Sequence, residues 1–158
     1  MSDPIIGPNE NDFLQVSPDK PSQQLDGIHV LVVEDNLIDL KVSVRLQEKA
    51  GATVITAQNG QEALEQSLLH TFDVILMDLC MPVMDGYTAA QHLRRMVATA
   101  TTPILAITAT EIPNNEAYCL SLGMNAYIAK PVSAAQLIDT VYHWATVPVP
   151  FNSAGVVS

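Results

Sequence analysis

Short apolar runs alternate with longer segments of helical periodicity along most of this chain. The apolar runs are rich in β-branched residues and predict strands at 29–33, 53–56, 73–77, 104–107 and 126–128. Apolar residues at helical spacing after each run predict helices at 36–50, 60–70, 86–97, 114–122 and 134–145. Five strand–helix units in succession indicate one α/β domain built on a parallel sheet.

Two of the predicted strands are apolar at every position. Residues 30–33 and 74–77 do not alternate between apolar and polar side chains, as a strand with one face in water would. A strand of this kind is covered on both faces, so the pattern predicts a doubly wound sheet with helices on both sides. Ligands of such sheets bind at the carboxyl ends of the strands.

Both ends of the chain lack these periods. Residues 1–26 contain four of the ten prolines and five carboxylates against one lysine, which predicts a flexible acidic linker. Residues 148–158 begin with two closely spaced prolines and predict a flexible tail. The folded domain is therefore expected at 27–147.

Charge and composition exclude several classes of protein. Seven Lys and Arg against 17 Asp and Glu leave a net charge of −10, which argues against direct DNA binding. The apolar runs are too short to span a membrane, and the N-terminus does not resemble a signal peptide, so a cytoplasmic protein is expected. The two cysteines, Cys80 and Cys119, have no nearby Cys or His partners and predict neither a disulfide nor a zinc site.

Chemically functional side chains follow four of the five predicted strands. They are Glu34, Asp35, Asp78, Thr108 and Lys130. Because the carboxyl ends of parallel strands meet at one edge of the sheet, we expect these three carboxylates, one hydroxyl and one ammonium group to converge.

Other polar residues near these positions have simpler structural interpretations. Asn36 is expected to cap the first helix, with Asp39 in its first turn favoured by the helix dipole. Asp85 and Gly86 are expected to form a turn and a helix cap.

With functional residues at the ends of four predicted strands, the sequence resembles the receiver domain of two-component response regulators. The resemblance covers about residues 25–147, and its motifs lie at 32–36, 57–64, 78–86, 107–109 and 127–131. It implies a single flavodoxin-like domain with five helices around a five-stranded parallel sheet of order 2-1-3-4-5.

The resemblance also implies a phosphoryl-transfer site. Asp78 corresponds to the phosphoacceptor, which takes a phosphoryl group from a phosphohistidine on a sensor histidine kinase or a histidine phosphotransfer protein. Glu34, Asp35 and Asp78, with the backbone carbonyl of Cys80, correspond to the metal site. Three crowded carboxylates repel one another unless a cation bridges them, and oxygen ligands suit Mg²⁺, with Mn²⁺ as a substitute.

The remaining family positions are held by Lys130, Thr108, Tyr127 and Pro131. Lys130 and Thr108 are expected to contact the phosphoryl oxygens. Thr108 and Tyr127 match the family's switch pair, which changes the surface formed by the fourth helix, the fifth strand and the fifth helix. The Lys130–Pro131 peptide bond is a candidate cis bond.

Two other functions compete with this interpretation. A phosphohydrolase with an aspartyl nucleophile needs a second Asp two residues after Asp78, where this chain has Cys80. A degenerate receiver acting only as a protein-binding module is disfavoured because the acidic set is complete. The chain is expected to catalyse its own phosphorylation and dephosphorylation without ordinary turnover. We expect either a stand-alone regulator or the receiver of a hybrid sensor kinase, and the sequence around residues 25–36 favours the second. Kinase activity is expected only if the chain is part of such a hybrid kinase.

Overall fold

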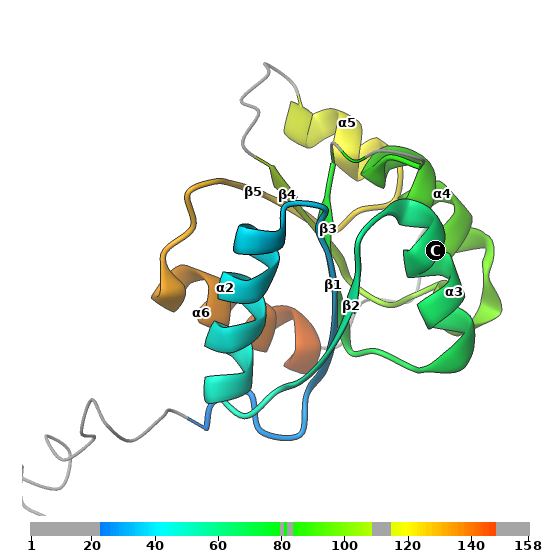
Figure 1. The fold of residues 1–158 in the computed structure, drawn as a ribbon. Coiled ribbons are helices and arrows are strands. Elements are labelled where there is room, and N and C mark those ends of the chain that lie inside the picture. Colours follow the sequence, from blue (N-terminus) through cyan, green and yellow to red (C-terminus); the bar gives the residue numbers. More distant parts are fainter. Residues whose placement is uncertain (1–22, 80, 82–83, 109–114, 148–158) are drawn as a thin grey trace, which may run out of the picture.

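The structure, a computed structural model, describes residues 23–79, 81, 84–108 and 115–147. Within these residues, strands and helices alternate (Figure 1). The strands are β1 (His29–Val33), β2 (Thr53–Ala57), β3 (Val74–Asp78), β4 (Ile104–Thr108) and β5 (Ala126–Ala129). The helices are α2 (Leu37–Lys49), α3 (Gly60–Leu69), α4 (Gly86–Arg95), the short 3-10 helix η1 (Val97–Thr99), α5 (Asn115–Ser121) and α6 (Ala134–Thr146).

The five strands form one parallel sheet in the order β2-β1-β3-β4-β5. This confirms the predicted fold class and strand order. In the register, Val33 at the end of β1 lies between Ala57 of β2 and Met77 of β3. The ends of β1 and β3 are therefore adjacent, and the residues that follow β1 lie beside Asp78.

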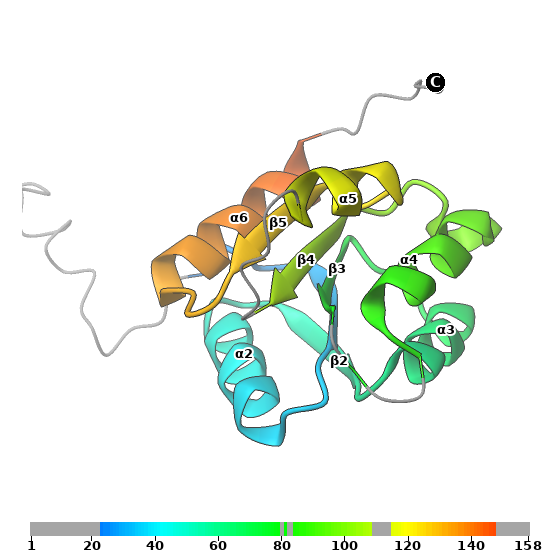
Figure 2. The same ribbon diagram turned by 90° about the horizontal axis from the view of Figure 1, so that it is seen from above.

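Helices cover both faces of the sheet, as expected for a doubly wound fold (Figure 2). On one face, Leu40 of α2 and Leu137 and Val141 of α6 pack with buried side chains of the sheet. On the other face, Ala63 of α3 and Cys119 of α5 belong to a second core cluster, to which α4 also contributes. Both faces of β3 are thus buried, which explains why this strand is apolar up to Asp78.

Side-chain caps mark the helix starts. The Oδ1 atom of Asn36 accepts hydrogen bonds from the first-turn amides of α2, and Asp85 Oδ1 accepts one from the Thr88 amide at 2.8 Å. Asn59 caps α3 by accepting from the Glu62 amide at 2.9 Å. Each cap satisfies an amide that has no partner within its helix. The predicted caps at Asn36 and Asp85 are confirmed.

The helix ends differ from the predicted ranges by a few residues. The helix predicted to reach residue 97 stops at Arg95, because Met96 has an extended backbone with φ −87° and ψ 136°. The chain then enters η1. The longest helices, α2 and α6, have 13 residues each. None of the described helices is long and apolar enough to cross a bilayer.

Packing against the domain begins within residues 1–26, the segment predicted as a linker. Leu25 is fully buried in the core, and its amide donates a hydrogen bond to the carbonyl of Ala50 at 2.8 Å. Gln24 donates through its side chain to Asp139 of α6 at 3.1 Å. A single large apolar residue carries too little pattern to reveal such packing in the sequence. The predicted tail at 148–158 and residues 1–22 lie outside the described residues.

Candidate functional site

Three carboxylates meet where β1 and β3 end. Glu34 and Asp35 follow β1, and Asp78 is the last residue of β3. One ligand atom from each of the three lies within 4.8 Å of the others. Glu34 and Asp78 are buried, with 6% and 7% of their surface exposed, whereas Asp35 is exposed. The structure therefore brings together the acidic residues that the sequence placed at separate strand ends.

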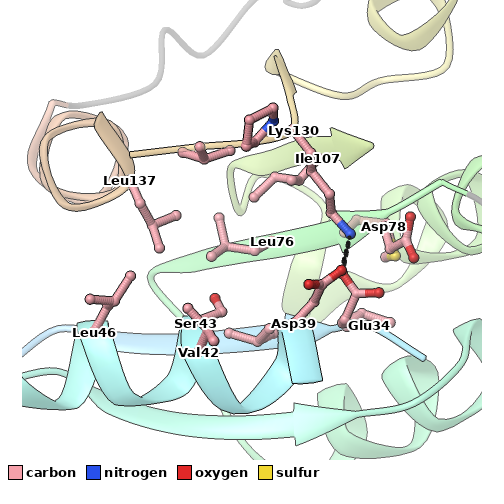
Figure 3. A pocket seen from close by; sticks show the side chains of 15 residues that line it. Glu34, Asp39, Val42, Ser43, Leu46, Leu76, Asp78, Ile107, Lys130 and Leu137 are labelled. Atoms are coloured by element: carbon pink, nitrogen blue, oxygen red, sulfur yellow. Dashed lines mark hydrogen bonds and ion pairs between the residues drawn. The ribbon is translucent and has the colours of Figure 1, made fainter. Parts of the chain in front are cut away.

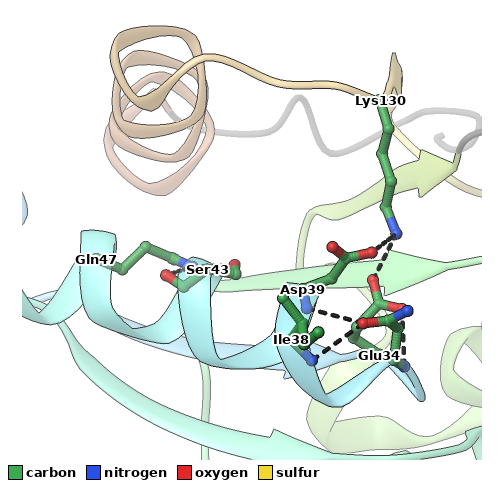
Figure 4. Close-up of polar contacts among 7 residues, drawn as sticks. Glu34, Ile38, Asp39, Ser43, Gln47 and Lys130 are labelled. Atoms are coloured by element: carbon green, nitrogen blue, oxygen red, sulfur yellow. Dashed lines mark hydrogen bonds and ion pairs between the residues drawn. The ribbon is translucent and has the colours of Figure 1, made fainter.

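Lys130 reaches this cluster from the loop after β5. Its Nζ atom lies 2.8 Å from Glu34 Oε1 and 3.0 Å from Asp39 Oδ2 (Figure 4). Partial burial alone would lower the pKa of Lys130. Hydrogen bonds to Glu34 and Asp39 and the charges of Glu34 and Asp78 outweigh it, so the pKa is raised. Lys130 is therefore a cation at neutral pH.

The end of β4 lies beside β3 in the sheet, and β5 lies on the far side of β4. Thr108 is the last residue of β4 and is buried, and its carbonyl accepts a hydrogen bond from the Lys130 amide at 2.8 Å. Tyr127 of β5 is half-buried and packs against the core cluster to which α3, α4 and α5 contribute. The Lys130–Pro131 peptide bond is cis, the isomer that the resemblance to the receiver family implied. Cys80 lies outside the described residues.

The carboxylate cluster carries a net negative charge. Glu34, Asp35 and Asp78 contribute three formal negative charges, and the adjacent Lys130 contributes one positive charge. Carboxylates this close repel unless a cation or a proton intervenes, and burial of two of them strengthens the repulsion. Hard oxygen donors match the ligand preference of Mg²⁺, and zinc would be expected to recruit thiolate or imidazole ligands. The residues present thus fit a divalent cation of the Mg²⁺ type.

Comparison with known proteins assigns the family. The model of the response regulator receiver domain matches residues 30–142. The chain belongs to this family. It is 40% identical over 119 residues to the hybrid signal transduction protein dokA of Dictyostelium discoideum. It is 36% identical over 118 residues to the sensor protein GacS of Pseudomonas syringae.

These relatives are much longer than the matched region. Each match covers 73% of this chain, but only 7% of dokA and 13% of GacS. Among solved structures, the receiver domain of the sensor histidine kinase PA1611 from Pseudomonas aeruginosa is 34% identical, with a TM-score of 0.70. That match covers 75% of this chain and 98% of the other, whose active-site cleft holds a coordinated magnesium ion. The chain is therefore a receiver domain of two-component signalling, similar to those of sensor kinases.

Sequence reasoning missed one member of the site of this receiver domain. The sequence predicts only that the helix dipole favours Asp39 in the first turn, yet its carboxylate pairs with Lys130. Its position in the first turn of α2, directly after the acidic pair, was the available signal. The pairing itself joins residues 91 positions apart and depends on the tertiary fold.

A cavity of about 440 Å³ opens beside the Lys130 side chain (Figure 3). It lies between α2 and α6 and is mostly apolar, with Leu46, Leu76 and Leu137 among its walls. Asp39 and Lys130 also line it. The side chain of Lys130 therefore borders open space on the side that faces α2.

Two glycines lie where described backbone segments near the end of β3 come close together. The Gly60 amide donates to the Met84 carbonyl at 2.9 Å, and a Cβ atom at Gly60 would lie 2.6 Å from that oxygen. A Cβ atom at Gly86 would collide with the Asp78 carbonyl. Only glycine permits both close approaches, so these two positions help to place the chain around Asp78.

Proposed function

We propose that this receiver domain accepts a phosphoryl group on Asp78 from a phosphohistidine of a sensor histidine kinase or histidine phosphotransfer protein. The observation that supports this most directly is the convergence of Glu34, Asp35 and Asp78 within 4.8 Å, with Lys130 beside them, at the carboxyl ends of the strands. Neither β-sheet packing nor helix formation requires three carboxylates at one point. Their cost in repulsion indicates a functional requirement.

In the proposed transfer, one oxygen of the Asp78 carboxylate attacks the phosphorus atom. The bond between phosphorus and the imidazole nitrogen breaks, its electron pair stays on nitrogen, and that nitrogen takes up a proton from water. The product is an acyl phosphate on Asp78 and a neutral histidine. The burial of Asp78 fixes the direction of its carboxylate and limits access of water to the product.

The other residues stabilise charge during this transfer. Glu34, Asp35 and Asp78, with the backbone carbonyl of Cys80, would hold Mg²⁺, and Mn²⁺ would be accepted as a substitute. When bound, the metal offsets negative charge on the carboxylates and the phosphoryl oxygens. Lys130 places its ammonium group against one phosphoryl oxygen, and the Thr108 hydroxyl donates to another.

Thr108 and Tyr127 are proposed to transmit phosphorylation to the surface. When Thr108 is drawn toward the phosphoryl group, the half-buried ring of Tyr127 gains space to turn inward. The affected surface is that of α5, β5 and α6. This mechanism needs two packing arrangements of similar free energy, between which the phosphoryl group selects.

We further propose that the domain is the receiver of a hybrid sensor kinase in the cytoplasm, with the acidic segment before residue 23 as a linker. The similarity to dokA and GacS supports this placement. Kinase activity would then belong to other parts of such a protein, and the receiver itself would not bind DNA.

Labelling with a small phosphodonor tests the proposal. Incubation with radiolabelled acetyl phosphate and Mg²⁺ is expected to label the wild-type domain, measured after gel filtration. Asp78→Asn should abolish the label, and Asp26→Asn, an exposed residue in the turn before β1, serves as the matched control. A label that persists in Asp78→Asn, or that forms in excess EDTA, would contradict the assignment.

A further inference from the structure

Two carboxylates share the Lys130 ammonium group, and they come from different elements. Glu34 lies in the loop after β1, whereas Asp39 lies in the first turn of α2 (Figure 4). The distances of 2.8 Å and 3.0 Å are both those of charge-assisted hydrogen bonds. Lys130 is thus held on the α2 side of the cluster.

Asp39 is not a member of the carboxylate cluster. The group of ligand atoms within 4.8 Å consists of Glu34, Asp35 and Asp78. Among the described residues, the Asp39 carboxylate pairs with Lys130, and 46% of the Asp39 side chain is exposed. Asp39 therefore acts on the site through the position of Lys130.

Lys130 would have to serve two kinds of partner during phosphorylation. Its proposed role is to contact a phosphoryl oxygen on Asp78, and the same ammonium group is bound by Asp39 before phosphorylation. The two partners lie on different elements, α2 and β3 (Figure 3). The cavity bordered by Asp39 and Lys130 gives the lysine side chain room for alternative conformers on the α2 side. Every conformer bound to Asp39 takes one of the three ammonium protons away from the phosphoryl group.

We propose that Asp39 is a positioning residue that competes with the phosphoryl group on Asp78 for Lys130 and so weakens the phosphorylated state. This inference rests on the proposed function of Asp78. It adds a residue on α2 that sets how strongly Lys130 holds the phosphoryl group. The ion pair between Asp39 and Lys130 is weak because the Asp39 side chain is half exposed. Its removal should therefore change the affinity for a phosphoryl group about two- to fivefold.

The test uses fluoroberyllate as a reversible mimic of the phosphoryl group. Its dissociation constant is measured calorimetrically with excess Mg²⁺ for the wild-type domain, Asp39→Asn and Glu48→Gln. Glu48→Gln removes one exposed carboxylate from the same helix at a distance from Lys130. Asp39→Asn is expected to tighten binding about two- to fivefold, whereas Glu48→Gln should leave it unchanged.

A double-mutant cycle separates competition from simple charge removal. In the Lys130→Met background, Asp39→Asn should no longer tighten binding, because the shared cation is gone. If Asp39→Asn tightens binding equally with and without Lys130, the effect is long-range electrostatics and the inference is wrong. It is also wrong if Asp39→Asn leaves the affinity unchanged or weakens it in the wild-type background.

A measurement without metal or phosphoryl group tests the resting contact. The NMR signal of the Lys130 ε-methylene group should shift in Asp39→Asn and stay unchanged in Glu48→Gln. An unchanged signal in Asp39→Asn would show that the pair does not exist in solution. A wild-type domain that acetyl phosphate does not label at Asp78 would instead refute the proposed function itself.

Discussion

Cys119 shows how the surroundings of one residue alter its chemistry. It lies on α5 with no exposed surface, among apolar side chains of the core cluster. Burial raises the pKa of its thiol, and the charge of Glu116 raises it further, against a smaller opposing effect of a backbone hydrogen bond. The folded state therefore disfavours the thiolate more than the unfolded state does.

The raised pKa of Cys119 should make the free energy of unfolding fall as the pH rises. Below the pKa of the thiol in the unfolded chain, the thiol is neutral in both states and Cys119 makes its full contribution to stability. Above about pH 8.5 the unfolded thiol loses its proton first, so the free energy of unfolding declines. Urea unfolding between pH 7 and 10 should show a steeper decline for the wild type than for Cys119→Ala. Equal slopes would place the thiol in an environment that does not perturb it.

At the scale of elements, Arg94 joins α4, η1 and the entrance to β5. Its guanidinium group donates to the carbonyls of Gly123, Thr99 and Thr102 and to the side chain of Asn125, at 2.7 to 2.9 Å. These acceptors are all neutral, and burial lowers the pKa of Arg94 to about 10. Arg94 thus acts as a structural cross-link between loops at the edge of the domain.

Replacement of Arg94 should destabilise the fold more than replacement of its neighbour. Arg94→Met removes four hydrogen-bonding partners and leaves partly buried carbonyls unpaired, so we expect a loss of about 2–4 kcal/mol in the free energy of unfolding. Arg95→Met, at the next and exposed position, should change it by less than about 0.5 kcal/mol. Chemical denaturation of both variants measures the difference, and similar losses would show that the cross-link contributes little.

At the scale of the whole molecule, the acidic site works against the stability of the fold. The chain has a net charge of −10, and three carboxylates are crowded at one edge of its sheet. Repulsion within that cluster is part of the folded state and is largely relieved when the chain unfolds. A ligand that binds the cluster should therefore stabilise the entire domain.

Mg²⁺ should raise the thermal midpoint of the domain. At 100 times its dissociation constant, a ligand specific for the folded state adds about 2.7 kcal/mol to the free energy of unfolding. Scanning calorimetry at constant ionic strength should show this rise for the wild type and a much smaller one for Asp78→Asn. Without metal, Asp78→Asn should be the more stable protein because one repelling charge is gone. A rise of equal size in both proteins would place the metal elsewhere.

Much of the fold could be predicted because its signals are local. The apolar runs of β1 and β3 and the caps at Asn36 and Asp85 each lie within a few adjacent residues. Helix ends were less predictable, as at Met96, because the extended backbone there has no strong signal in side-chain type. The convergence of Glu34, Asp35 and Asp78 was predictable because parallel strands bring their carboxyl ends to one edge.

The sequence by itself determined the alternation of strands and helices, the edge of the sheet that carries the site and the acidic residues that form it. Only the tertiary structure decided that Leu25 belongs to the core, that Arg94 joins three segments, and that Asp39 shares Lys130 with Glu34. These contacts join residues far apart in the chain. Their existence depends on distances of a few ångströms between packed elements, which periodicity and local propensity do not encode.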